Sequence, residues 1–425
     1  MGKRALIFGA SGVTGWSFVN ELLNDYPTTG VWDRVVAMTN RPLKQEDSLW
    51  PADSRLQIVS GIDLLKGSQA DLEASLKDKV KTNDKVTHVY YLAAYKASTD
   101  MQQELEYAVS MFRRSTTAMD TLSPSLEFVV LQTGAKMYGC HLLDNHPTDY
   151  IHVPLSEDQP RLRAPYHDSL FYHPQLDWLS DFAKSKSWSW CETRPDIIIG
   201  FVPNQNFYSL ATVLGIFLAL YASVEGKGAQ CPFPGTSKSW VAKSCDSSSD
   251  MIARQTLHLS LTLPKAQRGE GFNVADSKQP ESWSTKWPVL CDYFGLKGTG
   301  PSKEGQSTLE VRKYINDHIA DWKELEEQSG LKEGVADSDL TFKGFEVSPT
   351  APGFPQSVAD KWQYFLLTQF DFDRQYDMTK MYSTPKDKPF TEERSTIQAW
   401  GLVFDRMRKG KLIPEELRVD SPHAA

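Results

Sequence analysis

The sequence predicts an α/β fold in which a doubly wound parallel sheet carries a smaller, mostly helical cap. In the first half, short apolar strand patterns alternate with helical patterns, and strands joined through helices run parallel in one sheet. The second half instead has more Pro, Gly, Trp and charged helical stretches. The 425 residues also exceed the length of one typical core, so a second unit is expected.

The predicted elements follow one another from the amino end. Strands are expected at 5–8, 35–38, 56–60, 86–92, 128–132 and 190–199, and helices at 14–23, 102–119, 311–328 and 391–407. Residues 272–275 form one further apolar strand pattern, which we expect to return to the sheet. We therefore predict a first domain at residues 1–200, with a returning segment at about 245–276, and a discontinuous cap at residues 201–425.

Composition and charge argue against several classes of protein. Apolar residues make up 40% and charged residues 24%, as in a globular protein. The net charge of −8 argues against nucleic-acid binding, which uses basic surfaces. The longest apolar stretch, Leu210–Tyr221, is shorter than the ~18–20 residues that span a bilayer. We expect no membrane segment there, but a buried cap helix or a surface that pairs two copies in a homodimer.

The cysteines and the amino end predict a cytoplasmic protein. The cysteines form no CxxC pair and no zinc-like spacing with histidines, so we expect neither a disulfide framework nor a metal site. They stand at Cys140, Cys191, Cys231, Cys245 and Cys291. The apolar run at 5–8 is too short for the core of a signal peptide.

A glycine-rich turn follows the first predicted strand and opens a helix. Its spacing is GxxGxxG: Gly9 permits a tight turn, Gly12 lets a pyrophosphate approach the backbone, and Gly15 allows close packing of helix and strand. The helix N-terminus offers N–H groups to the phosphates. The pattern predicts an NAD(P)-binding Rossmann fold; the alternative is a turn of another α/β protein. The predicted cofactor contacts here are Gly9, Ser11, Gly12, Val13, Thr14 and Gly15.

The end of the second strand favours NADPH over NADH. NAD sites usually carry an acid there, which would repel a 2′-phosphate. Here the chain reads Asn40-Arg41, and an arginine can bind that phosphate through charge-assisted hydrogen bonds. Asp63, after the third strand, is placed like an adenine-contacting acid, or it caps a loop. The GxxGxxG spacing resembles that of the short-chain dehydrogenase/reductase superfamily, above all its extended members.

The usual catalytic Tyr-x-x-x-Lys pattern of that superfamily is missing from the middle of the chain. It occurs only beyond the last predicted strand, where we interpret it as chance, at Tyr293/Lys297, Tyr376/Lys380 and Tyr382/Lys386. Two other segments carry a lysine and a tyrosine in the middle of the chain. Lys136 follows the fifth strand in Leu-Gln-Thr-Gly-Ala-Lys, and Tyr172 stands in Phe-Tyr-His-Pro-Gln-Leu-Asp before a helical stretch.

These two segments resemble the signatures of the progesterone 5-beta-reductase/iridoid synthase-like family, an atypical branch of the extended reductases. The resemblance implies that Lys136 and Tyr172 are the catalytic pair and that both, with Thr133, lie against the cofactor. Within the second segment, two positions depart from the family pattern: His173 replaces a tyrosine and Leu176 a glutamate. Ala94 stands where plant members of the family often have a tryptophan, which indicates a fungal or microbial branch.

The resemblance further implies NADPH-dependent reduction of an activated C=C bond in an enone or enal. Tyr172 would donate a hydrogen bond to the carbonyl oxygen, and Lys136 would favour its acidity. The partner would be a small carbonyl or unsaturated carbonyl compound. Three alternatives stay open: a ketoreductase, a cyclase or isomerase without net redox change, and an NADP(H) sensor.

Overall fold

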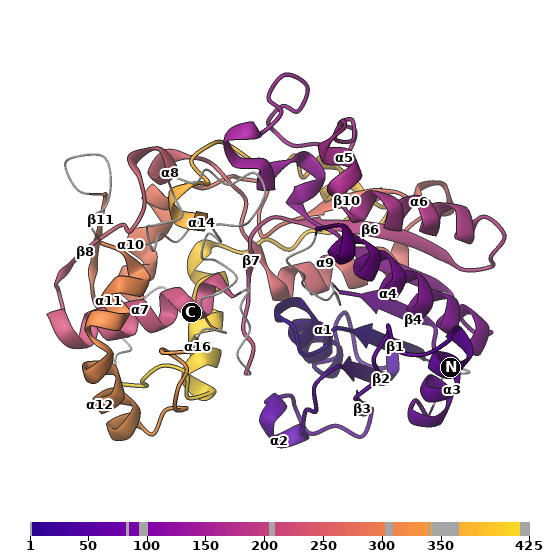
Figure 1. The fold of residues 1–425 in the computed structure, drawn as a ribbon, viewed down its shortest axis with the longest axis horizontal. Helices are drawn as coiled ribbons and strands as arrows, with labels where there is room; N and C mark the ends of the chain where they lie inside the picture. Colours follow the sequence, from indigo (N-terminus) through magenta and orange to yellow (C-terminus); the bar gives the residue numbers. More distant parts are fainter. Residues whose placement is uncertain are drawn as a thin grey trace.

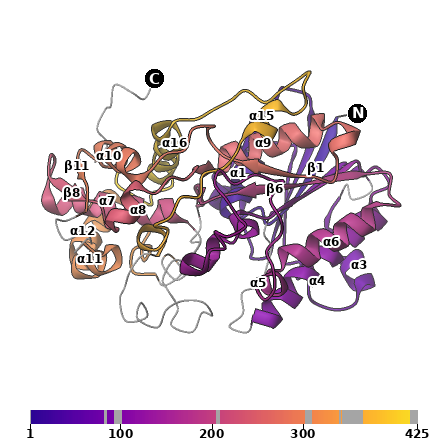
Figure 2. The same cartoon turned by 90° about the horizontal axis from the view of Figure 1, so that it is seen from above.

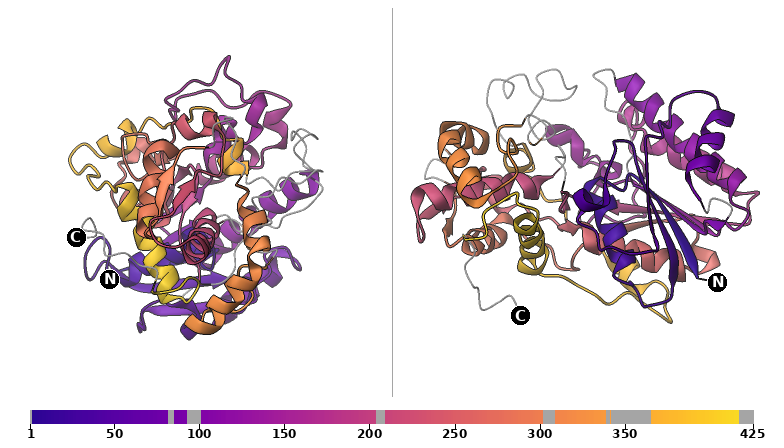
Figure 3. Two further views of the ribbon diagram at one scale, coloured as in Figure 1. Left: turned by 90° about the vertical axis from the view of Figure 1, so that its left-hand side faces the viewer. Right: turned by 90° about the horizontal axis from the view of Figure 1, so that it is seen from below.

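Two lobes lie side by side in the computed structural model (Figure 1). The sheet lobe contains the amino end, and the cap lobe is built mainly from helices of the second half. Figure 3 shows the same two lobes from the side and from below. The structure describes residues 2–81, 85–92, 101–203, 209–301, 309–338, 341 and 365–416.

The sheet lobe is built on a seven-stranded parallel sheet with the strand order β10-β6-β5-β4-β1-β2-β3. The strands are β1 (Lys3–Phe8), β2 (Trp32–Thr39), β3 (Leu56–Ser60), β4 (His88–Tyr91), β5 (Phe128–Gln132), β6 (Ser189–Pro195) and β10 (Gly271–Val274). The predicted doubly wound sheet is confirmed, and so is the returning strand. The strand order reverses between β1 and β4, and ligands of such sheets bind beyond the carboxyl ends of the strands at this point.

Helices cover both faces of the sheet (Figure 2). Helices α1 (Val13–Leu23) and α9 (Ser249–Thr262) lie on one face, and α3 (Gln69–Lys79), α4 (Met101–Leu122) and α6 (Tyr172–Ala183) lie on the other. Side chains alternate along each strand, so Ile7 belongs to one apolar core and Phe8 to the other. Burial on both faces explains why the strands are continuous apolar runs.

The cap lobe surrounds α7 (Leu210–Glu225), whose residues from Leu210 to Ala222 are all buried within the single chain. This helix is therefore core, which was one of its two predicted roles, and it presents no free apolar face for pairing. Among the described helices, none has the length and apolar character that a membrane crossing requires. The other elements of this lobe are β8 (Gln230–Pro232), α8 (Ser237–Val241), α10 (Trp283–Tyr293), β11 (Lys297–Thr299), α11 (Val311–Asp317), α12 (Ile319–Ser329), α14 (Phe365–Thr368) and α16 (Thr396–Lys409).

The remaining elements are short connecting pieces. They are α2 (Gln45–Ser48), η2 (Ala135–Tyr138), η3 (Cys140–Asn145), α5 (Tyr166–Ser169), β7 (Ile198–Ile199), β9 (Ser247–Ser248), η4 (Lys265–Gln267) and α15 (Thr379–Ser383). β7 and β9 pair with each other outside the main sheet.

Three predicted elements were wrong in extent. The helix expected at 391–407 begins only at Thr396, because Ser395 forms a capping box with Gln398 there. The strand expected at 190–199 stops at Pro195, because the amide of Asp196 donates to the hydroxyl of Ser247 and no longer to a neighbouring strand. The helix expected at 311–328 is two helices, which meet where His318 leaves helical geometry. Ile315 and Trp322 are both buried, so the apolar periodicity continues across the break and hides it.

After α14 the chain returns from the cap lobe to the sheet lobe. We call residues 371–395 the strap. Its Tyr376 pairs with Leu155 in a parallel bridge, and α15, which belongs to it, packs on β10 (Figure 2). In the strap, Arg374 Nε lies 3.1 Å from Asp196 Oδ2, and both side chains are only 3% exposed. The domain boundaries predicted above stay a prediction, but the strap shows that chain beyond residue 276 also contacts the sheet.

Arg374→Met is expected to lower the free energy of unfolding by about 3–5 kcal/mol, because it leaves the carboxylate of Asp196 buried without its partner. Urea denaturation measures the change. Lys184→Met is the matched control, because Lys184 and Asp181 form an ion pair whose side chains are 72% and 82% exposed. That control should change stability by at most about 1 kcal/mol. Equal losses in the two variants would contradict the role given to the buried pair.

Candidate functional site

The glycine turn lies at the carboxyl end of the central strand β1. Gly9 has φ +85°, a conformation that favours glycine, and Gly12 donates from its amide to the Gly9 carbonyl at 2.9 Å. A Cβ on Gly15 would lie 2.1 Å from the Gly9 carbonyl oxygen. Helix α1 thus approaches the turn so closely that only glycine fits at position 15.

The start of α1 can accept an anion. Gly12 is its N-cap and brings no capping side chain, and no acidic residue lies in the first turn. The first N–H groups of the helix are therefore left for phosphate oxygens. Ser11 is half-buried, and Val13 and Thr14 are buried. These are residues that fit the pyrophosphate of a dinucleotide.

The predicted adenosine contacts lie at the ends of β2 and β3, next to the turn. Asn40 and Arg41 are exposed, and the carbonyl of Arg41 accepts from the Thr39 hydroxyl at 2.8 Å. Asp63 is exposed, and its carboxylate accepts from the Leu65 amide at 2.9 Å. Asp63 therefore caps its loop, the alternative that the sequence left open, and its contact with adenine stays a prediction.

The predicted catalytic pair comes from the ends of two different elements. Lys136 lies in η2, directly beyond β5, and Tyr172 is the first residue of α6. A Cβ on Gly134 would lie 3.7 Å from the Tyr172 hydroxyl and 3.2 Å from the Pro195 carbonyl oxygen. The tyrosine hydroxyl thus lies against the backbone that leads from β5 into η2, at the same edge of the sheet as the glycine turn.

Packing of α6 against α4 holds Tyr172 in this place. Gln175 donates from its side-chain amide to the Ala108 carbonyl at 3.0 Å, and Leu179 is fully buried. The two departures from the family pattern lie on this buried face: His173 is 0% and Leu176 is 4% exposed. The ring of His173 stacks on His167, with centroids 4.5 Å apart. Both departures therefore lie in the buried packing of α6, and Tyr172 itself is retained.

The surroundings of Lys136 disfavour the charged form of its amine. Although the residue is exposed, desolvation by the surrounding atoms lowers the pKa of the amine, against the opposing charge of Glu104. Burial lowers the pKa of His141 to about 3, and the charge of Lys136 adds to this lowering. His141 is consequently neutral at physiological pH.

Thr133 has a partner inside the protein. Its hydroxyl donates to Glu192, and Arg194 Nη2 lies 2.7 Å from the other carboxylate oxygen of that glutamate. Arg194 also donates to the Tyr138 hydroxyl at 3.2 Å, which ties η2 to β6. The structure thus assigns the Thr133 hydroxyl to a buried network behind Lys136, and its contact with a cofactor stays a prediction.

Sequence reasoning missed Gln132, the last residue of β5. It is 4% exposed, its Nε2 donates to the Thr14 hydroxyl at 3.2 Å, and its Oε1 has no partner among the described residues. It connects the glycine-turn helix to the strand that leads to Lys136, with one acceptor unused. The signal was present as a polar residue that ends an otherwise apolar strand.

The cysteines lie inside the protein. All five cysteines are free and buried. Burial raises the pKa of the Cys140 thiol, so this residue, although near η2, is no thiolate nucleophile at neutral pH.

Comparison with known proteins identifies the family. Residues 5–414 match the model of the PRISE-like Rossmann-fold domain. The chain belongs to this family. The match confirms the resemblance to the progesterone 5-beta-reductase/iridoid synthase-like enzymes. Short chain dehydrogenase ausT of Aspergillus calidoustus is 33% identical over 99% of this chain and 96% of that protein. (S)-8-oxocitronellyl enol synthase ISY1 of Nepeta racemosa is 30% identical, and the match covers 77% of this chain and 78% of that protein.

The fold of this PRISE-like protein also occurs in distant solved structures. A UDP-glucuronic acid 4-epimerase variant of Bacillus cereus superposes with a TM-score of 0.55 at 14% identity, covering 96% of this chain and 99% of that one. At this identity the likeness concerns the fold alone. Family membership and the glycine turn together support an NAD(P)-dependent oxidoreductase of the short-chain dehydrogenase/reductase superfamily.

Proposed function

We propose that this protein is an NADPH-dependent reductase of the activated C=C bond in a small enal or enone. The observation that carries the proposal is the position of the Tyr172 hydroxyl, 3.7 Å from a Cβ placed on Gly134, in the segment that ends at Lys136. The tyrosine hydroxyl thus lies against the segment that carries Lys136, at the carboxyl edge of the sheet and beside the turn that fits a dinucleotide.

The residues present fit the cofactor. Gly9, Gly12 and Gly15 give the turn and the open helix end for the pyrophosphate. Arg41 is exposed and lies outside the packed core, and its guanidinium would bind the 2′-phosphate. When bound, the reduced nicotinamide supplies a hydride.

Charge develops on the substrate oxygen during the reaction. Hydride addition to the β-carbon of an enal moves an electron pair onto the carbonyl oxygen. The Tyr172 hydroxyl donates a hydrogen bond to that oxygen and stabilises the developing charge. Lys136 stabilises the ionised form of Tyr172 by its positive charge, so the tyrosine gives up its proton more readily.

A relative supports conjugate reduction over simple carbonyl reduction. The name of the Nepeta racemosa protein describes the synthesis of an oxocitronellyl enol. An enol is what protonation at oxygen gives after hydride has reached the β-carbon of an enal. Direct reduction of the carbonyl carbon would give an alcohol. This chemistry favours the C=C bond as the target of the chain described here.

The test is turnover of a panel of enals, enones and saturated ketones with NADPH deuterated at C4 of the nicotinamide. The expected result is loss of the near-ultraviolet absorbance of NADPH and deuterium at the β-carbon of the product. Deuterium at the carbinol carbon would instead identify a ketoreductase. Product without loss of NADPH would identify a cyclase or isomerase, and binding without turnover of any compound would identify a sensor.

Arg41→Ala is expected to weaken NADPH binding by about 10- to 100-fold and to leave NADH binding unchanged, because only NADPH carries the 2′-phosphate. Fluorescence titration with both cofactors measures the two affinities. Lys184→Ala is the matched control, since it removes an exposed cation at the far end of α6. An equal loss for both cofactors would show that Arg41 does not read the phosphate.

A further inference from the structure

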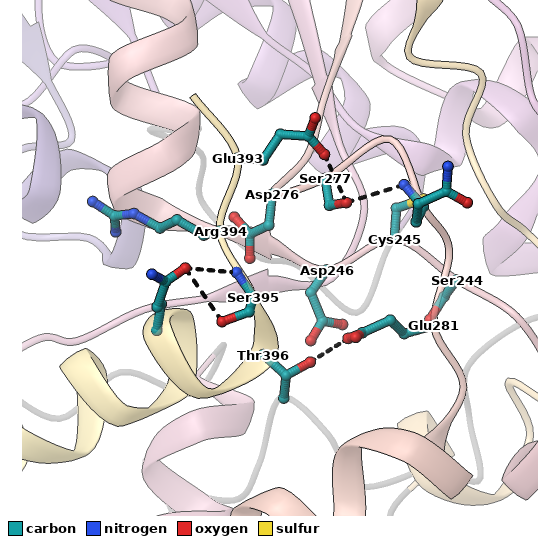
Figure 4. Close-up of a pocket in the computed structure, with 12 residues that line it drawn as sticks. Ser244, Cys245, Asp246, Asp276, Ser277, Glu281, Glu393, Arg394, Ser395 and Thr396 are labelled. Atoms are coloured by element: carbon teal, nitrogen blue, oxygen red, sulfur yellow. Dashed lines mark hydrogen bonds between the residues drawn. The ribbon is translucent and has the colours of Figure 1, made fainter. Parts of the chain in front are cut away.

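A cavity of about 380 Å³ lies where the sheet lobe, the cap lobe and the strap meet (Figure 4). Three chain segments line it: residues 244–246 before β9, residues 276–281 after β10, and residues 393–398, which end the strap and begin α16. Backbone hydrogen bonds between Ser244 and Glu281, and from the Asp276 amide to the Asp246 carbonyl, connect the first two segments. None of the residues predicted for cofactor binding or catalysis lines this cavity.

The cavity wall is acidic. It contains Asp246, Asp276, Glu281 and Glu393, and Arg394 as its only basic residue among the described lining. Figure 4 shows the guanidinium of Arg394 directed away from Asp246 and Glu281; its Nη1 lies 3.8 Å from Asp250. The arginine therefore does not neutralise the opposite wall.

Three of the four acids have charged or side-chain partners that join them to other parts of the wall or the core. Asp246 lies 2.7 Å from Lys286 Nζ and accepts from the Trp400 indole at 2.8 Å. Glu281 accepts from the Thr396 hydroxyl, and Glu393 pairs with Lys278 at 3.1 Å. These acids are built into the wall.

Asp276 differs, because half of its carboxylate is unused. Its Oδ1 accepts from the Ser248 amide at 2.8 Å and from the Ser248 hydroxyl at 2.5 Å. Asp276 is only 4% exposed, and its Oδ2 is buried without a hydrogen-bond partner among the described residues. In Figure 4 the carboxylate faces the space between Arg394 and Asp246. Buried carboxylate oxygens in proteins normally accept a hydrogen bond. Oδ2 of Asp276 accepts none from the described residues, so a ligand in the cavity could supply the missing donor.

We propose that this cavity binds a small protonated amine, whose ammonium group donates to Asp276 Oδ2. An ammonium ion carries three donors and the charge that an acidic wall attracts. Hydroxyl and amide groups of Ser277, Ser395 and Gln398 line the same space and can receive further polar groups of the ligand. The described residues contain no cluster of His, Cys, Asp and Glu that could hold a metal ion. The volume also falls within the range of small-molecule sites. Because the site joins α16 to the end of β10, an occupant would connect the two lobes.

Putrescine is the probe, and calorimetric titration of the whole protein is the measurement. Saturable binding of putrescine, without binding of butane-1,4-diol or succinate, is the expected result. Asp276→Asn keeps the acceptor for Ser248 and removes the charge, so it should weaken putrescine binding about tenfold or more. Asp181→Asn, which removes an exposed carboxylate from α6, should bind like the native protein.

Proton release gives an independent readout. Burial raises the pKa of Asp276 to about 7; Asp246 adds to the rise, and Ser248 and Arg394 oppose it. The other charged groups near the cavity are Glu281, Glu393, Lys278 and Lys286. Near pH 7 an arriving ammonium group favours the ionised carboxylate, so binding should release protons, and the measured heat should change with the ionisation enthalpy of the buffer.

If Asp276→Asn does not fold, Gln279→Trp replaces it as the test, because this exposed residue lines the cavity and a large side chain there would fill it. That variant should lose putrescine binding and keep the native circular dichroism. The proposal is overturned by absence of saturable binding, by equal binding of butane-1,4-diol, or by native affinity in the folded variants. None of these measurements depends on reductase activity, so a negative result would contradict the amine site without contradicting the proposed reaction.

Discussion

Tyr172→Phe is expected to lower kcat of enal reduction by about 100- to 1,000-fold, because it removes the donor that stabilises charge on the substrate oxygen. The ring itself should stay in place, since it packs edge-to-face on Phe171 with centroids 4.8 Å apart. NADPH affinity and thermal stability are therefore expected to stay close to those of the native protein. Single-turnover absorbance measurements at saturating NADPH separate the chemical step from binding.

The matched control is Tyr166→Phe. Tyr166 begins α5, is half-buried and packs on the same apolar core as Tyr172, but its hydroxyl has no part in the proposed reaction. It should leave kcat nearly unchanged. A comparable loss of kcat in both variants would mean that general repacking of this region, and not proton donation by Tyr172, controls the rate.

The sheet could be predicted because its signals are local. Each central strand is a short apolar run, and burial on both faces imposes that composition. The glycine turn is equally local, since Gly9, Gly12 and Gly15 meet within a single turn and the space there excludes any larger residue. Because ligands of parallel sheets bind beyond the carboxyl ends of the strands, the predicted sheet also predicts the edge at which the site lies.

Contacts between distant segments could not be predicted. The ion pair of Asp196 and Arg374 joins residues 178 positions apart. The amide of Asp196 donates to the Ser247 hydroxyl, 51 positions away, and β6 stops there earlier than its sequence pattern suggests. The strap that carries Arg374 has mixed polarity, so neither strand nor helix periodicity marks it. Thr133 is a similar case within the site. Its partner Glu192 lies on the neighbouring strand, and only the register of β5 and β6 brings the two together.

For Tyr172 and Lys136, the family pattern identifies the candidate residues, and the structure shows where their segments lie. The segments that contain them could be recognised from the sequence, but nothing in the residues alone places the first residue of α6 against the backbone after β5. That placement depends on the docking of α6 on α4, through contacts such as Gln175 with Ala108. The roles of the two residues are proposed from the pattern, and the position of the Tyr172 hydroxyl beside Gly134 follows from tertiary packing.

Gly15→Ala is expected to weaken cofactor binding strongly and to destabilise the sheet lobe. The added Cβ would lie 2.1 Å from the Gly9 carbonyl oxygen and 2.7 Å from the Ala10 Cα. Both neighbours are backbone atoms of the turn, so no side chain can rotate away, and α1 must move from β1. We expect a loss of about 3 kcal/mol or more in the free energy of unfolding. NADPH affinity should fall by about a hundredfold or more, because the helix end no longer meets the pyrophosphate.

Gly401→Ala provides the control of opposite sign. Gly401 lies inside α16, and a Cβ there would meet its nearest neighbours at 3.7 and 3.8 Å, which is ordinary contact. The same chemical change should therefore stabilise the protein by about 0.5–1 kcal/mol, because alanine favours a helix interior over glycine. Urea denaturation and NADPH titration of both variants measure the contrast. Native-like NADPH binding by Gly15→Ala would show that the closeness of helix and turn is not what builds the cofactor site.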